Sequence, residues 1–107
     1  MTYAVRFAPE AAEQLEALYH YIAAAASPSI AAGYVDAIVA HCEGLAVFPH
    51  RGRLRSEIRP GLRTSSYKKR AVIASLVDDE ARQVTILGVF YGGQDYESLL
   101  GGPDDSN

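Results

Sequence analysis

The period of the apolar residues changes along the chain, from a helical period in the first half to a strand period in the second. Between residues 9 and 46, apolar side chains recur every three or four positions, as on one face of a helix. Between residues 62 and 90, β-branched and bulky residues form short runs separated by turn-forming residues. Helices that come early and strands that come late predict an α+β domain, with a helical hairpin packed on one face of a mostly antiparallel sheet.

Two helices are predicted, over residues 9–25 and 28–46. Pro9 suits the first turn of the first helix, and Ser27 is expected to cap the second, with Pro28 at its first position. The apolar stripe of the first helix is Leu15, Leu18, Tyr19 and Ile22, and that of the second is Tyr34, Ile38, Cys42 and Leu45. Because the link between them is short, the two helices should form an antiparallel hairpin.

Four strands are predicted, over residues 3–7, 62–66, 70–77 and 83–90. Residues 78–81 should form the loop of a hairpin between the last two strands, and residues 50–61 should be irregular. One or two helical turns are expected over residues 94–100. The predicted order is therefore β-α-α-β-β-β with a short C-terminal helix, a four-stranded sheet in all.

The length of 107 residues leaves room for one domain, over residues 1–100, with residues 101–107 expected to be a disordered tail. Cys42 is the single cysteine and has no partner for an internal disulfide. The N-terminus lacks the pattern of a signal peptide, and the longest alanine-rich apolar stretch is too short to span a bilayer. We therefore expect a cytoplasmic protein with no membrane association.

The net charge of −3 is unevenly distributed. Eight of the ten Lys and Arg residues lie between Arg51 and Arg70, where Glu57 is the only acidic residue, so this segment carries +7. The rest of the chain carries −10. Such a segment can attract an anionic partner, or it can be a solvated loop and strand edge, and charge alone leaves both interpretations open.

Several kinds of catalytic or ligand site are poorly supported. The candidate soft metal ligands are not at a recognised metal-binding spacing: His20, His41, Cys42 and His50. Gly92-Gly93 lacks the length and the Lys-Ser/Thr of a phosphate-binding loop. Cys42 lies in a helix among apolar residues, where a structural thiol is more usual than a reactive one. We therefore expect no metal and no cofactor.

The strongest candidate site is a basic and aromatic group on the late strands. Its members are Arg59, Arg63, Tyr67, Lys68, Lys69 and Arg70 on or beside two neighbouring strands, with Tyr91 at the end of a third. Arginine and lysine bind phosphates, and tyrosines stack on bases or exchange protons at a phosphodiester. For each tyrosine taken alone, the favoured interpretation is a strand residue with a packed ring and a solvated hydroxyl.

Several segments, in their order and spacing, resemble the ParE branch of the ParE/RelE toxins over residues 2 to about 100. Residues 57–63 read Glu-Ile-Arg-Pro-Gly-Leu-Arg, and residues 84–95 read Val-Thr-Ile-Leu-Gly-Val-Phe-Tyr-Gly-Gly-Gln-Asp. The Val-Asp-Asp turn at 77–79, the early Pro-Glu-Ala at 9–11 and Pro-His-Arg-Gly-Arg at 49–53 are similar to the family as well.

The resemblance implies a bacterial toxin of a type II toxin–antitoxin system, a growth inhibitor that forms a hetero-oligomer with its antitoxin. An extended antitoxin segment would contact the outer faces of the helices. The side chains expected at this contact are Leu15, Leu18, Tyr19, Tyr34 and Ile38. These apolar side chains could instead serve only the core.

The resemblance leaves two mechanisms of toxicity open. ParE-like members poison DNA gyrase without being enzymes, and the expected target-binding residues are then Arg59, Arg63, Tyr67, Lys69 and Arg70. RelE-like members are ribosome-dependent mRNA endonucleases, with catalytic residues that would here be Arg63, Lys68, Lys69, Arg70 and Tyr91. The Arg-Pro-Gly-Leu-Arg segment favours gyrase, and so does a basic charge that stops at Arg70 except for Arg82. A third hypothesis is a non-toxic or degenerate anion-binding module.

Overall fold

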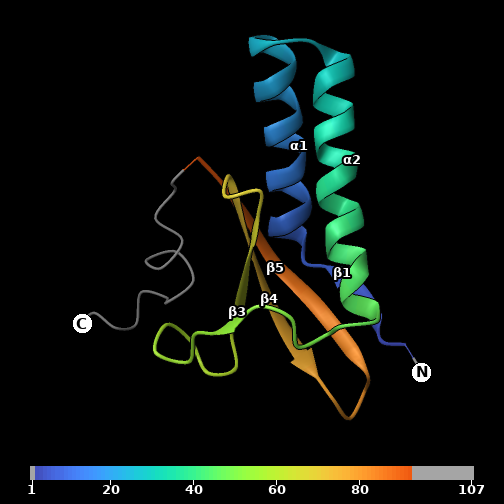
Figure 1. Cartoon of the computed structure of the whole chain (residues 1–107), viewed down its shortest axis with the longest axis vertical. Coiled ribbons are helices and arrows are strands. Elements are labelled where there is room, and N and C mark those ends of the chain that lie inside the picture. The colour runs from blue at the N-terminus through green and yellow to red at the C-terminus, as the bar shows by residue number, and fades with distance from the viewer. Residues whose placement is uncertain (1, 93–107) are drawn as a thin grey trace.

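The computed structural model describes residues 2–92, which form a helical hairpin on one face of a five-stranded sheet (Figure 1). The elements are β1 (Ala4–Phe7), α1 (Pro9–Ala25), α2 (Pro28–Glu43), the 3-10 turn η1 (Gly44–Ala46), β2 (Arg53–Leu54), β3 (Arg63–Tyr67), β4 (Ala71–Asp78) and β5 (Gln83–Tyr91). The predicted α+β class and the order of the predicted elements are confirmed. The helical turns expected over 94–100 and the tail at 101–107 lie outside the described residues.

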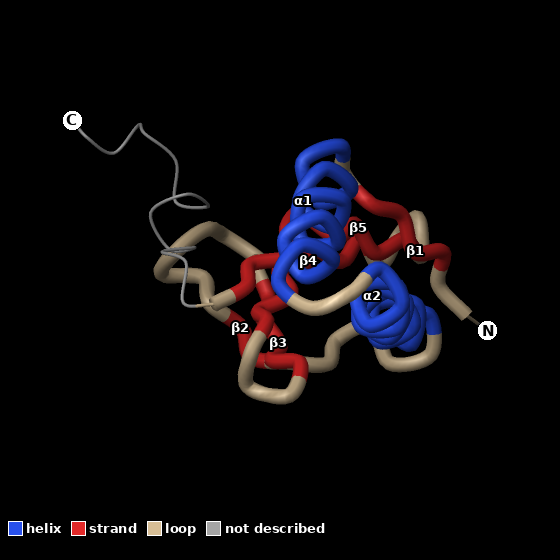
Figure 2. The backbone as a smooth tube through the Cα atoms, turned by 90° about the horizontal axis from the view of Figure 1, so that it is seen from above, coloured by secondary structure: helices blue, strands red, loops and turns tan. Residues whose placement is uncertain are grey.

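The sheet has the strand order β1-β5-β4-β3-β2. The first strand pairs parallel to β5, with Val5 opposite Val84, and the other neighbours are antiparallel. Seen from above, β1 and β2 lie on opposite sides of the molecule (Figure 2). The prediction of four strands was wrong by one, because β2 has only two residues and lies in the segment expected to be irregular. A strand that short cannot show an alternating pattern.

The helix ends follow the predicted signals. Ser27 accepts a hydrogen bond from the backbone N–H of Ile30 at 3.1 Å, and Pro28 occupies the first turn of α2. Pro9 has the same place in α1, directly after Ala8, whose N–H bonds to the carbonyl of Ile86 at 2.9 Å. This bond fixes the start of α1 beside the first half of β5.

The two late hairpins have different turns. In the β4–β5 hairpin, Oδ1 of Asp78 accepts the N–H groups of Glu80 and Ala81, each at 3.1 Å. In the β3–β4 hairpin, Lys68 and Lys69 both have positive φ, 51° and 57°. The N–H of Arg70 closes that turn on the carbonyl of Tyr67 at 3.0 Å. Two lysines thus occupy a left-handed conformation that ordinarily favours Asn and Gly.

The main core lies between the helices and the sheet. Its fully buried side chains include Ala11, Ile38, Cys42, Leu45, Ile73, Val84 and Ile86. Burial raises the pKa of the Cys42 thiol to about 12, which agrees with the prediction of a structural thiol. A smaller cluster of Leu62, Ala74 and Phe90 forms the second core, with Ile58 packed against it. No helix among residues 2–92 combines the length and the apolar character needed to cross a bilayer.

Candidate interaction site

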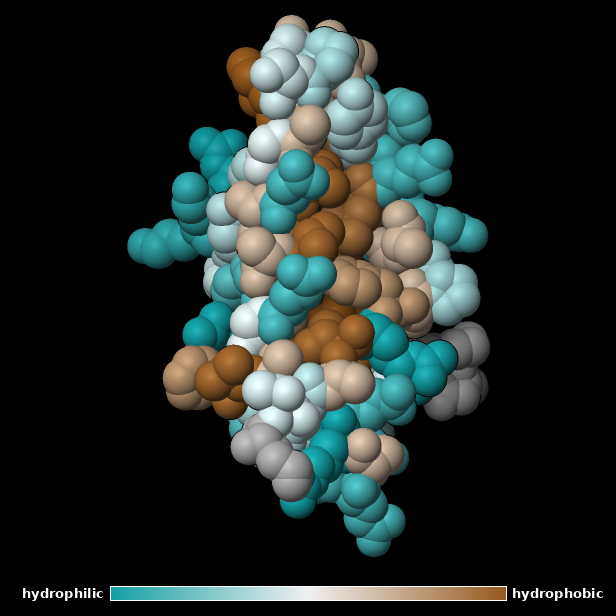
Figure 3. Space-filling view, turned by 90° about the vertical axis from the view of Figure 1, so that its right-hand side faces the viewer, coloured by the Kyte–Doolittle hydropathy of each residue, from teal (hydrophilic) through white to brown (hydrophobic). Residues whose placement is uncertain are grey.

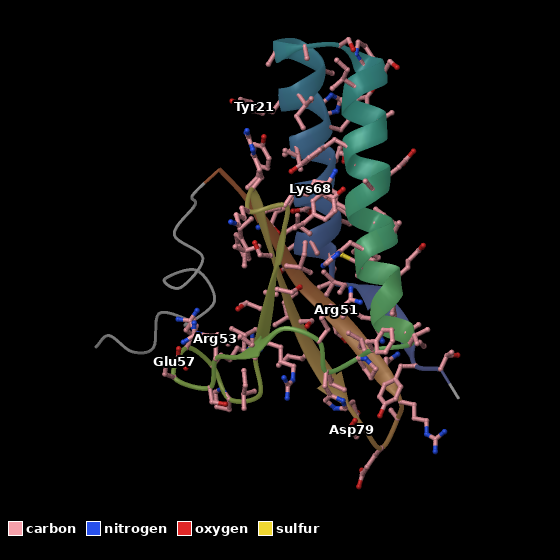
Figure 4. All side chains as sticks on the ribbon, viewed as in Figure 1. Tyr21, Arg51, Arg53, Glu57, Lys68 and Asp79 are labelled. Carbon is pink, nitrogen blue, oxygen red and sulfur yellow. The ribbon has the colours of Figure 1, made fainter. Side chains whose placement is uncertain are left out.

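The basic residues of the 51–70 segment lie along one side of the molecule, from the end of α2 through β2 and β3 to the β3–β4 turn. Figure 4 shows Arg51 beside the end of α2, Arg53 near Glu57, and Lys68 at the β3–β4 turn, far from both. The positive charge is therefore spread along an edge of the sheet and does not converge on one point.

The five predicted target-binding residues fall into two groups at opposite ends of β3. Arg63 is its first residue and Arg59 lies in the loop before it, whereas Tyr67 is its last residue and Lys69 and Arg70 follow it. Five strand residues span about 13 Å between the first and last Cα, at the usual rise per residue. Arg59, Lys69 and Arg70 are exposed, whereas Arg63 is half-buried and donates from Nη1 to the carbonyl of His50 at 3.1 Å.

The predicted nuclease residues divide at the same place. Tyr91 is adjacent to the β3–β4 turn, because it pairs with Ala71 and the N–H of Gly92 bonds to the carbonyl of Arg70 at 3.1 Å. Lys68, Lys69, Arg70 and Tyr91 therefore share one end of the sheet, and Arg63 lies at the other end of β3.

An aromatic group connects the helices with this end of the sheet. The ring of Tyr34 on α2 lies edge-on to those of Tyr67 and Tyr91, with centroids 5.8 Å apart in both pairs. Tyr21 of α1 meets Tyr91 at 6.3 Å, and His41 meets Tyr67 at 5.5 Å. The structure thus packs both predicted site tyrosines against helical aromatic residues. Tyr21 and His41 were missing from the predicted site, since nothing in their spacing places them opposite strand ends.

The hydroxyl of Tyr34 is buried and has no hydrogen-bond partner within the described part of the chain. Burial raises the pKa of Tyr34, and the neighbouring Tyr91 and Tyr67 raise it further. The hydroxyl is therefore protonated at neutral pH. Because a buried polar group without a partner costs free energy, this position is a source of instability in the folded chain.

A first hollow lies between α1 and the end of β5, with a volume of about 380 Å³. Gln14, Ala17, Leu18, Tyr21, Val89, Tyr91 and Gly92 line it. A second, of about 470 Å³, lies at the edge of β3 and is called the β3-edge hollow below. It is lined by His41, Arg51, Gly52, Arg53, Arg55, Thr64, Ser65, Ser66 and Val72. Most of these residues belong to the basic segment 51–70, but none of them was among the predicted site residues.

A polar cluster joins the N-terminus, the loop after α2 and the β4–β5 hairpin. The hydroxyl of Tyr3 donates to Oδ1 of Asp79 at 2.7 Å, and Nε2 of His50 lies 3.0 Å from the same oxygen. The hydrogen bonds from Tyr3 and then from His50 lower the pKa of Asp79. Within residues 2–92, no three His, Cys, Asp or Glu side chains are grouped as they would be around a metal ion.

The predicted antitoxin-binding residues differ in exposure. Leu18 and Ile38 are buried in the core, whereas Leu15, Tyr19 and Tyr34 are half-buried. Among residues 2–92, the large hydrophobic side chains that are exposed are Tyr21, Ile30, Val47, Phe48 and Leu54. On the side of the molecule where α2 lies, a band of hydrophobic residues runs along the long axis between polar flanks (Figure 3). The apolar stripes of the two helices predict that Leu18 and Ile38 are buried. No such pattern predicts the exposure of Val47 and Phe48, because these residues follow the last helical turn.

Comparison with known proteins places the chain among toxins. Residues 5–96 match the family described as the ParE toxin of the type II toxin–antitoxin system parDE. A search of the curated proteins finds no match.

Two solved structures are similar in fold. One is described as a chromosomal ParDE toxin–antitoxin system from P. aeruginosa, with a TM-score of 0.74 and 22% identity, over 86% of this chain and 98% of that one. The other is described as the toxin–antitoxin complex RelBE2 from Mycobacterium tuberculosis, with a TM-score of 0.65 and 27% identity, over 86% of this chain and 93% of that one.

Proposed function

The chain belongs to the ParE toxin family of type II toxin–antitoxin systems, and from this membership we propose that it arrests bacterial growth by inhibiting DNA gyrase in the cytoplasm. The observation that carries the proposal is the family match over residues 5–96. Family membership alone does not determine the cellular target. The arrangement of the site residues is the second observation that supports gyrase.

The separation of the basic residues favours binding over catalysis. A nuclease needs its proton donor, its acceptor and its charge-stabilising group around one phosphodiester. Here Arg63 lies at the opposite end of β3 from Lys68, Lys69 and Tyr91. Positive side chains spread along an edge suit a protein–protein contact with a large acidic partner surface. We propose that Arg59, Arg63, Tyr67, Lys69 and Arg70 contribute to that contact.

We propose further that a cognate antitoxin neutralises the chain by covering the apolar surface of the helical hairpin. Of the two similar structures reported above, one is described as a toxin–antitoxin system and the other as a toxin–antitoxin complex. The half-buried Leu15, Tyr19 and Tyr34 would supply this surface, together with the exposed Tyr21 and Ile30. An apolar band on the exterior of a small domain is typical of a surface that another chain covers. The buried Leu18 and Ile38 would support this surface from below.

A second candidate is ribosome-dependent cleavage of mRNA. The observation in its favour is the juxtaposition of Arg70, in the turn before β4, with Tyr91, at the end of β5; the N–H of Gly92 donates to the carbonyl of Arg70. Lys68 and Lys69 lie in the same turn. In this mechanism Tyr91 would exchange a proton, so Tyr91→Phe should lower RNA cleavage by more than about tenfold, roughly 1.4 kcal/mol.

Inducible expression in growing bacteria tests the proposed function. We expect arrested growth with a DNA-damage response, relief by the antitoxin, and weaker arrest when Arg59, Arg63 and Lys69 are all replaced by alanine. The matched control is Arg6→Ala, which removes a positive charge at the opposite edge of the sheet. Unchanged arrest by a folded triple variant would remove these residues from the target contact. Harmless expression of a folded, partner-free chain would favour the non-toxic binding module instead.

A further inference from the structure

The β3-edge hollow has the composition of an anion-binding site. Three arginines, one histidine and three hydroxyl side chains line it, with Val72 as the one large apolar residue. Guanidinium groups and hydroxyls are the side-chain donors that most often bind phosphate oxygens. The volume of about 470 Å³ is far larger than a single water molecule requires.

Two of the arginines form no ion pair within the described part of the chain. Arg55 pairs with Glu57, but among residues 2–92 no acidic side chain forms an ion pair with Arg51 or Arg53. The Arg51 guanidinium lies over the ring of Phe48, whose centroid is 5.6 Å away. The three arginines of this hollow therefore outnumber the carboxylate beside them, Glu57, which pairs with Arg55 and whose pKa is lowered by the hydrogen bond from Arg55 and by the charges of both Arg55 and Arg53.

Gly52 allows the two arginines to lie against the sheet. It has a φ of 96°, and a Cβ atom at this position would lie 2.5 Å from the carbonyl oxygen of Thr64. Any other residue would push the Arg51–Arg53 segment away from β3. Since β2 pairs only with Arg63 and Thr64, the edge of β3 is open to the hollow from Ser65 onward.

The side of the hollow away from the arginines is polar, and it is formed by His41 of α2 and Ser65 of β3. Nε2 of His41 lies 3.5 Å from Oγ of Ser65. Burial and the positive charge of Arg51 lower the pKa of His41, so the ring is neutral at pH 7. The loop that carries Arg51 is tied to the sheet through His50, because its carbonyl accepts from Arg63 at 3.1 Å and its ring contacts Asp79 at 3.0 Å.

We propose that the β3-edge hollow binds a phosphate group, with Arg51 and Arg53 as its charged donors and Ser65 and His41 as its neutral donors. The phosphate belongs to a nucleotide or to the backbone of a nucleic acid. None of these four residues is among the five proposed to contact gyrase, although Ser65 lies on β3 between Arg63 and Tyr67, so the two surfaces are adjacent. The ligand-binding test below does not depend on gyrase inhibition.

The test is a titration of the purified full chain, followed by NMR. Inorganic phosphate, a nucleoside monophosphate and a ten-nucleotide single strand are added separately at constant ionic strength. We expect the ring signals of His41 and the amide signal of Ser65 to shift, while the ring signals of His20, exposed on α1, stay unchanged. Arg51→Ala and Arg53→Ala should each weaken binding by roughly tenfold, as expected for the loss of a charged hydrogen-bond donor.

Arg6→Ala is the matched control, since it removes the same charge from β1 at the far edge of the sheet. Arg53→Lys keeps the charge but loses the fork of donors, and it should bind with intermediate strength. Equal affinity for the nucleotide and the single strand would identify a free nucleotide as the ligand, and tighter, salt-dependent binding of the strand would identify a backbone phosphate. Equal weakening by Arg6→Ala, or an absence of shifts at His41, would overturn the proposal.

Discussion

The backbone N–H of Val89 donates to Oε1 of Gln14 at 2.7 Å, and this bond joins α1 to the part of β5 that β1 does not reach. The β1–β5 pairing ends at Ile86, so beyond this residue no strand from the described part of the chain pairs with β5 on that side. Gly88 leaves room for the contact, because a Cβ atom there would lie 3.2 Å from the same oxygen and 2.5 Å from the Phe90 ring. A helix side chain thus replaces a strand as the partner of β5.

Replacement of Gln14 by alanine should destabilise the fold. The N–H of the buried Val89 would lose its acceptor, at a cost of about 1–3 kcal/mol for an unsatisfied buried donor. Urea denaturation measures the loss. Gln14→Glu is the control, since its carboxylate can still accept the bond. An alanine variant as stable as the original chain would show that water or another group satisfies this N–H.

Replacement of Tyr34 by phenylalanine should stabilise the fold. The Tyr34 hydroxyl is buried without a partner among the described residues, so its removal lifts a desolvation penalty on the order of 1 kcal/mol. The ring contacts with Tyr67 and Tyr91 remain. Thermal unfolding should show a higher Tm for Tyr34→Phe and a lower one for Tyr34→Ala. A lower Tm for the phenylalanine variant would mean that the hydroxyl has a partner.

The β3–β4 turn should tolerate an Asn-Gly sequence better than its two lysines. Lys68 and Lys69 both have positive φ, which costs a residue with a side chain roughly 1–2 kcal/mol. The double variant Lys68→Asn, Lys69→Gly should therefore raise the free energy of unfolding by at least about 1 kcal/mol. Chemical denaturation checks this, with Lys68→Ala, Lys69→Ala as the matched loss of charge. If the Asn-Gly variant is no more stable than the alanine variant, the turn is not strained.

The contact between Tyr3 and Asp79 should make stability depend on acidic pH. The folded chain holds the pKa of Asp79 below its ordinary value, mainly through the hydrogen bond from Tyr3 and then through His50. Such a group stabilises the fold fully above the unfolded Asp pKa of about 3.9, and the stabilisation is lost as pH falls through the lower folded pKa. Asp79→Asn should therefore flatten the pH dependence of unfolding in this range.

NMR titration of the Asp79 carboxyl carbon tests the cause directly. Its pKa should rise in Tyr3→Phe, because the largest contribution is removed. Tyr21→Phe is the matched control, since Tyr21 lies at the opposite end of the molecule (Figure 4). An Asp79 pKa that does not change in Tyr3→Phe would contradict this account of the cluster.

Much of the fold was predictable because strong local signals agree with it. Pro9 and Pro28 mark the helix starts, and apolar periodicity separates helices from strands. The strand β2 was not predictable, since two residues carry no period and its pairing depends on Gly52 lying against Thr64. The positive φ of Lys68 and Lys69 was also not predictable from the sequence, because lysine does not favour this conformation and the fold imposes it.

The site was predictable in composition more than in geometry. The basic segment was apparent from the charge count, but its division into two groups follows from the length of β3, which separates Arg63 from Lys69. His41 seemed an ordinary helix residue, and only the packing of α2 beside β3 brings it to Ser65. Contacts between segments this far apart in the chain leave no trace in local spacing.

A gyrase supercoiling assay with the purified, folded chain tests the central claim most directly. The family assignment and the exposed basic edge lead us to expect lost supercoiling together with linearised plasmid, both reversed by the antitoxin. The triple variant of Arg59, Arg63 and Lys69 should inhibit less than Arg6→Ala. Full gyrase activity in the presence of a folded chain that still binds its antitoxin would contradict gyrase as the target and would favour cleavage of mRNA on the ribosome.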